Sequence, residues 1–366
     1  MPPEAITVAG GRVVGPLGIE QADVTIRGGV IASVQAATDE GEVLDATGLL
    51  VAPGFVDLQC NGGYGIDLAT EPERLWELAA LLPRYGPTAF LPTIVSSPPA
   101  VVDRALSAIA QRPSGFQGAE PLGLHLEGPM LNPSRRGAHS EQHLRAPRPA
   151  LIDGWSKATG VAMVTLAPEL PGALDVAAAL HKRGVVVSAG HTDATTTELI
   201  AGLDAGISMV THLFNAMAPF AHREPGPIGV ALADKRVTAG LIVDGLHVHP
   251  ITVAAAWAAL APDRLAVVTD AVAALGAGAV GPPGVRTPSG RLAGSVVSMD
   301  EAVRNLVSFA GCTPADAIAC ASTTPARLIG ASSKGKVAPG YDADLVLLTP
   351  ELHVAATIIG GAVFQH

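Results

Sequence analysis

The sequence predicts an α/β fold: an eight-stranded (β/α) TIM-like barrel joined to a small β-sandwich built from both ends of the chain. Through the middle of the chain, strand-like segments alternate with Ala- and Leu-rich helical segments, which is typical of βα units and a parallel sheet. The strand-like segments are near-continuous apolar runs, as expected of strands buried on both faces. Eight such units favour a barrel, and a doubly wound open sheet is the alternative.

Short hairpin-like segments at both ends predict the sandwich. Residues 1–50 contain short strand patterns with glycine pairs at their turns, such as Gly28-Gly29. Residues 334–366 continue in the same style, and their last hairpin turns at Gly360-Gly361. Because each end is too small to bury a core alone, we expect the two to assemble beside a barrel domain of residues 51–333.

The barrel elements follow from the apolar runs and from helical periodicity. The predicted strands are Leu50–Leu58, Thr88–Val95, Leu122–Leu126, Val161–Leu166, Val185–Ala189, Ser208–Thr211, Val237–Val243 and Leu265–Thr269. The predicted helices between them include Glu73–Leu82, Ala100–Ile109, Leu174–Arg183, Thr196–Ala205 and Ile251–Leu260.

The composition excludes several classes of protein. Of 366 residues, 48% are hydrophobic and 15% charged, which is incompatible with disorder. The 23 lysines and arginines against 33 acids, a net charge of −10, argue against nucleic-acid binding. The N-terminal residues do not resemble a signal peptide, and no apolar run reaches the roughly 20 residues of a membrane helix. With three cysteines in no paired spacing, we expect a cytoplasmic protein without a membrane partner.

Polar residues at the ends of the predicted strands indicate a metal site. In a barrel, the reactive side chains lie at the C-terminal strand ends. Glu127, His191 and His212 each close a different strand, and together they form a ligand set typical of catalytic zinc. Asp270 closes another strand and could take a proton from a bound water. One such residue alone is most often structural, but four on one face are hard to obtain by chance.

The first barrel strand adds a polar stripe. With a side-chain period of two, Asp57, Gln59 and Asn61 share one face, which we expect to look into the barrel. Cys60 then points toward the helices, so we interpret it as a core thiol and not a nucleophile.

The motifs at these positions resemble the N-acetylglucosamine-6-phosphate deacetylases, a family of the amidohydrolase superfamily. The combination of HLEGP, GAH and THLFNAM carries the resemblance, and weaker segments extend it over nearly the whole chain. These motifs lie at 125–129, 137–139 and 211–217, with further matches at 53–57, 190–191, 223–226, 244–248, 269–271, 292–295 and 338–346.

The resemblance implies a role for each site residue. Glu127, His191 and His212 would bind one divalent metal ion, zinc or in some relatives iron. Asp270 would be the general base that deprotonates the metal-bound water and then protonates the leaving amine. Substrate contacts are implied for Ala138, His139, Asn215, Ala216, Arg223, His247, Leu292, Ala293 and Gly294.

The resemblance implies that Arg223 recognises the phosphate, and its guanidinium fits phosphate oxygens bidentately. Arg135 and Arg136 are interpreted as solvated or loop-closing residues. Relatives in this family are homodimers whose phosphate site draws on the neighbouring subunit, so the resemblance implies a homodimer with its phosphate site near the subunit interface.

Gln59 and Asn61 depart from the wider superfamily. Many amidohydrolases carry a His-x-His pair at these two positions, where it holds a second metal. Neutral amides are poor ligands for a borderline-soft ion, so a single-metal site with Gln59 and Asn61 as remnants of the second is expected.

The expected reaction is hydrolysis of a linear amide bond, the deacetylation of N-acetyl-D-glucosamine 6-phosphate to D-glucosamine 6-phosphate and acetate in amino-sugar catabolism. One alternative is another amidohydrolase acting on a related N-acyl amino sugar or a cyclic amide. A second is a non-catalytic barrel that binds a ligand, although neither Asp270 nor any ligand is missing. The net negative charge does not exclude a phosphosugar, since a metal, Arg223 and a few histidines supply local positive charge.

Overall fold

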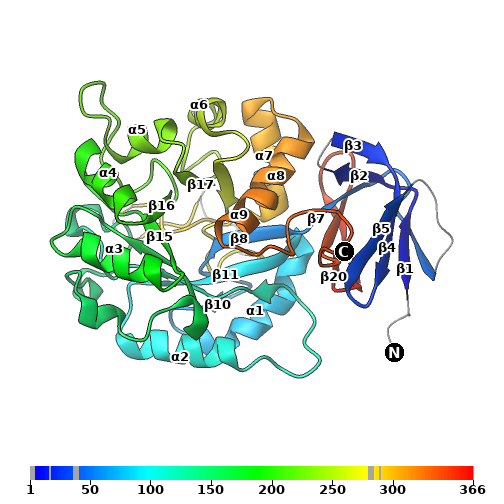
Figure 1. The fold of residues 1–366 in the computed structure, drawn as a ribbon, viewed down its shortest axis with the longest axis horizontal. Helices are drawn as coiled ribbons and strands as arrows, with labels where there is room; N and C mark the ends of the chain where they lie inside the picture. Colours follow the sequence, from blue (N-terminus) through cyan, green and yellow to red (C-terminus); the bar gives the residue numbers. More distant parts are fainter. Residues whose placement is uncertain (1–4, 16–17, 36–40, 279–283, 288–289, 366) are drawn as a thin grey trace.

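Eight parallel strands form a barrel in the computed structural model, which describes residues 5–15, 18–35, 41–278, 284–287 and 290–365. The strands follow one another in chain order around the ring. The first and last strands meet where Cys60 bridges Ala271 and where Asp270 N donates to Gln59 O at 2.9 Å. The predicted barrel is therefore confirmed over the doubly wound sheet (Figure 1).

The observed strands lie close to the predicted apolar runs. They are β8 (Phe55–Cys60), β11 (Pro87–Val95), β13 (Leu124–Glu127), β14 (Val161–Leu166), β15 (Val186–Ala189), β16 (Ile207–Val210), β17 (Thr238–Ile242) and β18 (Leu265–Val268). Every residue of β8, β13, β14 and β18 is buried, because side chains on one face fill the lumen while the others pack against the helices. Two short strands, β9 (Gly62–Gly63) and β10 (Ile66–Asp67), form a hairpin after β8, and β12 (Glu120–Pro121) adds to the edge of β11.

Helices cover the outside of the barrel. The α-helices are α1 (Leu75–Leu81), α2 (Pro99–Ala110), α3 (Ala173–Lys182), α4 (Thr196–Asp204), α5 (Gly226–Ala233), α6 (Pro250–Leu260), α7 (Met299–Ala310), α8 (Pro314–Ala321) and α9 (Thr323–Leu328). Local sequence sets their starts, as in α4, where Thr195 and Glu198 form a capping box. Among the residues that the structure describes, no helix has the length and apolar character needed to cross a bilayer.

Short 3₁₀ turns lie within the loops. They are η1 (Pro72–Arg74), η2 (Leu82–Tyr85), η3 (Pro133–Arg135), η4 (Glu141–His143), η5 (Pro149–Ile152) and η6 (Lys157–Thr159). Four of them, η3 to η6, lie in the long segment between β13 and β14, which passes over the C-terminal end of the barrel before it returns to β14.

Both ends of the chain form the predicted sandwich, seen at the right of Figure 1. One sheet has the order β5-β4-β1-β6 and the other β21-β20-β19-β7-β2-β3. A second hydrophobic core, with Val8 and Val24 from one sheet and Leu345 from the other, joins them. The strands are β1 (Ile6–Ala9), β2 (Arg12–Gly15), β3 (Gly18–Gln21), β4 (Asp23–Arg27), β5 (Val30–Gln35), β6 (Glu42–Asp45), β7 (Leu50–Pro53), β19 (Leu345–Leu348), β20 (Val354–Ile359) and β21 (Ala362–Gln365).

The predicted strand Leu50–Leu58 is in fact two strands. β7 pairs with β19 in the sandwich, whereas β8 pairs with β11 in the barrel. The chain passes from one to the other at Gly54, where a β-carbon would lie 2.2 Å from Thr88 Cγ2. The apolar run is continuous because both strands are buried, so hydrophobicity alone does not reveal the break. The division of the chain into residues 1–50, 51–333 and 334–366 stays a prediction. The sandwich strand β7 (Leu50–Pro53) extends past the first of these boundaries.

Candidate metal centre and catalytic site

A cavity of about 850 Å³ opens at the C-terminal ends of the barrel strands. This is where barrel folds place their functional side chains. Most of the site residues expected from the sequence line it: Asn61, Glu127, Ala138, His139, His191, His212, Asn215, Ala216, His247, Asp270, Leu292, Ala293 and Gly294.

Glu127 lies at the centre of the site, at the end of β13. Its Oε1 is 3.1 Å from His191 Nε2 and 3.0 Å from His212 Nε2, and the two imidazole nitrogens are 3.1 Å apart. In a tetrahedral zinc site with ligand bonds of about 2.0–2.1 Å, neighbouring ligand atoms are about 3.3–3.4 Å apart. The three atoms therefore form a triangle of nearly the size that a small divalent cation requires.

The proton on His191 supports the same conclusion. His191 Nδ1 lies 2.9 Å from Arg135 O, and a carbonyl only accepts, so Nδ1 carries a proton. Burial lowers the pKa of His191 to about 4, so the ring is neutral near pH 7 and Nε2 has a free lone pair. That lone pair faces Glu127 Oε1 and the Nε2 atom of His212. Electron pairs this close repel one another, and a cation bound between them would make the contact favourable.

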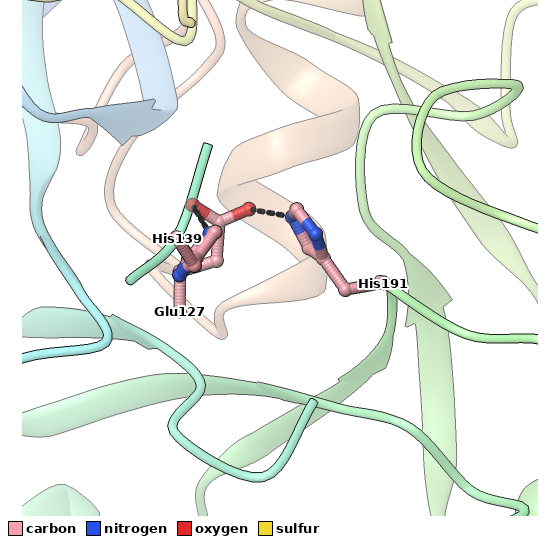
Figure 2. Close-up of side chains that lie close together, drawn as sticks. All are labelled: Glu127, His139 and His191. Carbon is pink, nitrogen blue, oxygen red and sulfur yellow. Dashed lines mark hydrogen bonds and ion pairs between the residues drawn. The ribbon is translucent and has the colours of Figure 1, made fainter. Parts of the chain in front are cut away.

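His139 lies in the same cluster but carries its proton on the other nitrogen. Figure 2 shows the Glu127 carboxylate between His139 and His191. Ser96 N donates to His139 Nδ1 at 3.2 Å, so Nδ1 accepts and Nε2 carries the proton. His139 Nε2 is 3.5 Å from Glu127 Oε2. Although these three residues are close enough to hold an ion, His139 presents a donor to the carboxylate rather than a lone pair.

Three carboxylates are buried at or beneath the site: Asp57, Glu127 and Asp270. In the described part of the chain, neither lysine nor arginine forms a hydrogen bond or ion pair with any of them. Buried charges are normally paired or bound to a metal. The residues present therefore fit a divalent cation.

Burial alone would raise the pKa of Glu127. The three imidazoles packed against it, His139, His191 and His212, outweigh burial and hold this pKa well below its usual range. The side chain therefore remains a carboxylate, the form that binds metals.

Backbone strain coincides with the proposed site residues. His191, His212 and Asp270 have φ values of 49°, 29° and 48°, in the left-handed region that residues with a β-carbon rarely occupy. Strain of this kind costs about 1–3 kcal/mol per residue and clusters at functional sites. The sharp turn at each strand end brings the side chain over the lumen instead of outward.

Asp270 lies beside the triangle and is almost fully buried. Its Oδ1 accepts from Asn61 Nδ2 at 2.7 Å and from Gln59 Nε2 at 3.1 Å. Burial, and next the charge of Glu127, raise the pKa of Asp270 to about 6. A carboxylate with a pKa close to the working pH is well suited to accept and return a proton.

His247 also lines the cavity, and a carboxylate holds one of its ring nitrogens. Its Nδ1 lies 2.7 Å from Asp244 Oδ2, so Nδ1 donates to that carboxylate. Burial opposes ionisation of Asp244, but the hydrogen bond and charge of His247 outweigh it and lower the pKa of Asp244. The other ring nitrogen, Nε2, is not held by that carboxylate, and the ring lines the cavity.

Arg223 and Arg135 lie in different positions relative to the cavity. Arg223 is exposed on the segment before α5 and does not line the cavity of its own chain. Arg135, interpreted from the sequence as solvated or loop-closing, lines the cavity, holds His191 through its carbonyl and pairs with Asp193 at 2.7 Å. Its carbonyl role has no sequence signal, since any residue offers one.

Asp57 lies beneath the site. Its Oδ2 accepts from Thr269 Oγ1 at 2.5 Å, and its Oδ1 accepts from Gln59 N at 3.1 Å and Thr269 N at 3.2 Å. Burial raises the pKa of Asp57 from 3.8 to about 7 despite these bonds. Between pH 3.8 and about 7, the folded protein therefore keeps a proton on Asp57 that the unfolded chain has released. The stability that this protonated group contributes is lost as the pH rises through about 7.

Replacing Asp57 by Asn is expected to remove this pH dependence. Asparagine keeps the size of the side chain but cannot ionise, so a change in the pH dependence belongs to the charge. In metal-free protein, the free energy of unfolding of Asp57→Asn should rise relative to wild type between pH 5 and pH 9, by a few kcal/mol at most, since each pKa unit corresponds to about 1.4 kcal/mol. Asp45→Asn is the control, because its exposed carboxylate has a lowered pKa. A difference in unfolding free energy that does not change with pH would contradict the prediction.

Comparison with known proteins gives a consistent result. The amidohydrolase family model matches residues 50–363. The chain is 38% identical to human N-acetylglucosamine-6-phosphate deacetylase, over 93% of this chain and 90% of that protein. It is also 38% identical to N-acetylgalactosamine-6-phosphate deacetylase of Escherichia coli O157:H7, over 94% of each.

A solved structure has the same fold. It is an aspartate-to-alanine mutant of N-acetyl-D-glucosamine-6-phosphate deacetylase from Mycobacterium smegmatis in complex with N-acetyl-D-glucosamine-6-phosphate. The TM-score is 0.88 and the sequence identity 31%, with 99% of each chain covered.

Proposed function

The chain belongs to the amidohydrolase family, and we propose that it is a metal-dependent deacetylase of N-acetyl-D-glucosamine 6-phosphate. The observation that carries the proposal is the triangle of Glu127 Oε1, His191 Nε2 and His212 Nε2, with Asp270 beside it in one cavity. The sequence resemblance agrees with this activity, and the relatives are named as deacetylases of N-acetyl amino-sugar 6-phosphates.

Glu127, His191 and His212 would hold one divalent metal ion, with zinc as the proposed metal because the ligands are two imidazoles and a carboxylate. When bound, such an ion lowers the pKa of water and polarises an amide carbonyl. Gln59 and Asn61 offer only neutral amides, so we propose a single ion per chain.

The chain's own residues carry the proton and the developing charge. Asp270 accepts a proton from the attacking water as its oxygen adds to the acetyl carbon. His139, with its proton fixed on Nε2, donates to the carbonyl oxygen as it becomes negative. Asp270 then delivers its proton to the sugar nitrogen while the C–N bond breaks, which releases acetate and the amino sugar.

The rest of the cavity would hold the sugar. His247, with its ring oriented by Asp244, would contact a sugar hydroxyl. The wall around it is lined by Ala138, Asn215, Ala216 and the loop of Leu292, Ala293 and Gly294. The exposed position of Arg223 is compatible with a homodimer in which this side chain reaches the cavity of the partner subunit. Both the homodimer and a cytoplasmic location are proposals.

Phosphate recognition is expected to dominate substrate choice. Charge-assisted hydrogen bonds are worth about 1.5–3 kcal/mol each, so two of them to the phosphate should raise kcat/KM about 10²–10⁴-fold over the unphosphorylated sugar. Comparing N-acetyl-D-glucosamine with its 6-phosphate measures this ratio. Equal kcat/KM values would contradict phosphate recognition.

Three glutamine variants identify the arginine. Arg223→Gln should lose the preference for the phosphate if Arg223 binds it, whereas Arg135→Gln and Arg291→Gln test the two arginines that line the cavity. A preference that survives Arg223→Gln and is lost in one of the other two would overturn the assignment of Arg223.

A second candidate substrate is N-acetyl-D-galactosamine 6-phosphate. The chain is equally identical to deacetylases named for each of the two sugars. Parallel kcat/KM measurements on the two 6-phosphates decide between them, and a higher value for the galactosamine compound would replace the proposed substrate.

A further inference from the structure

Two amide side chains of β8 and the residue after it hold one oxygen of Asp270. Asn61 Nδ2 donates to Asp270 Oδ1 at 2.7 Å, and Gln59 Nε2 donates to the same oxygen at 3.1 Å. Gln59 Nε2 also donates to Glu127 Oε1 at 3.1 Å, so its two N–H groups join the two carboxylates. The backbone adds a further tie, because Asp270 N donates to Gln59 O at 2.9 Å.

The carboxylates fix which way these amides face. Gln59 Oε1 and Asn61 Oδ1 are buried and have no hydrogen-bond partner among the described residues. Turning either amide over would place its oxygen against a carboxylate oxygen, which is repulsive. The amino ends therefore face Asp270 because of the charge on Asp270, and the carbonyl ends are left without a partner as the consequence.

This arrangement is the opposite of what a metal-binding role would need. An amide binds a cation through its carbonyl oxygen, because its nitrogen has no available lone pair. Here the amino groups occupy the space between β8 and the two carboxylates. The side chains at 59 and 61 therefore act on Asp270 and Glu127 as hydrogen-bond donors.

We propose that Asn61 and Gln59 are positioning residues for Asp270, which hold Oδ1 and leave Oδ2 as the oxygen that exchanges a proton with water and then with the amine. Amide N–H groups do not release protons at neutral pH, so an Oδ1 that accepts two of them is not available to the reacting groups. Oδ2 takes a proton from water as the O–C bond forms, and gives it to nitrogen as the C–N bond breaks. The inference rests on the proposed function.

Asn61 gives the cleaner test, because Gln59 also contacts Glu127. Asn61→Leu removes the donor while keeping a similar side-chain size, and it is expected to lower kcat about 10–100-fold with KM changed less than about threefold. Metal content per chain should equal that of wild type. The control is Asn305→Leu, which removes an amide donor to Val243 O outside the cavity and should leave kcat and metal content unchanged.

A double-substitution cycle separates positioning from a general structural effect. If Asn61 acts through Asp270, Asn61→Leu should change the residual rate of an Asp270→Ala background by less than about threefold. Circular dichroism and thermal midpoints show that each variant is folded. Should Asn61→Leu prove unfolded, Asn61→Ser, which keeps a hydroxyl donor, should retain more kcat than Asn61→Ala.

Several results would overturn the inference. These are an unchanged kcat in Asn61→Leu, a rise in KM alone, loss of metal, or an equal loss of rate in the Asp270→Ala background. Turnover by the wild-type enzyme tests the proposed function separately: if that function is wrong, the unmodified enzyme releases no acetate. Failure of the positioning role appears instead in the ratio of kcat between Asn61→Leu and wild type.

Discussion

Replacing Asp270 by Asn is expected to lower kcat by about 10²–10⁴-fold while leaving the metal content unchanged. The variant keeps the size of the side chain, and its carbonyl oxygen can still accept from Asn61 and Gln59. What it lacks is an oxygen that takes up a proton from water and returns it to the amine. Acetate release and elemental analysis on the same preparation measure both quantities.

The matched control is Asp234→Asn, a half-buried residue that pairs with Arg236 and does not line the cavity. It should retain wild-type kcat. The pH profile adds a second check: Asp270 works only when deprotonated, its pKa is raised to about 6, and a bound cation lowers it, so the acid limb of wild-type kcat should lie at or below about pH 6. Substantial turnover by Asp270→Asn would show that another group is the base.

His191→Asn is expected to lose most of the bound metal and at least about 10³-fold of the activity, because a three-residue ligand set that loses one member no longer holds the ion firmly. His139→Asn is the matched comparison, since both rings lie against Glu127 (Figure 2). It should keep the metal and lose about 10²–10³-fold in kcat, as expected for loss of a donor to the developing oxyanion.

This pair tests the assignment of protons to the two rings. His191 presents its Nε2 lone pair to Glu127, because its protonated Nδ1 donates a hydrogen bond to Arg135 O. His139 presents a protonated Nε2 to Glu127, because its Nδ1 accepts a hydrogen bond from Ser96 N. Loss of metal in His139→Asn, with metal retained in His191→Asn, would reverse the two roles.

The sequence was sufficient to predict the barrel because its signals are local. Buried parallel strands are apolar at nearly every position, as in β14, which begins and ends where predicted. Strand ends in a barrel meet on one face, so Glu127, His191, His212 and Asp270 could be placed together without a structure. The break at Gly54 was missed, because the glycine is required by a contact with Thr88, which is distant in sequence.

The features that sequence analysis missed depend on contacts between distant segments. The carbonyl of Arg135 fixes the proton of His191, and Ser96 N fixes that of His139, yet backbone groups leave no trace in the residue type. The proposed donor role of Gln59 and Asn61 has no sequence signal either, because a strand pattern shows which face a side chain shares but not which atom of an amide faces its neighbour.

Acetate release from N-acetyl-D-glucosamine 6-phosphate, measured before chelation, after chelation and during titration with zinc, is the most direct test of metal-dependent deacetylation. Activity should be lost when the metal is removed and should return to a plateau at about one equivalent per chain, as a single ligand set requires. Undiminished acetate release by metal-free protein, or a plateau reached only at two equivalents, would contradict it.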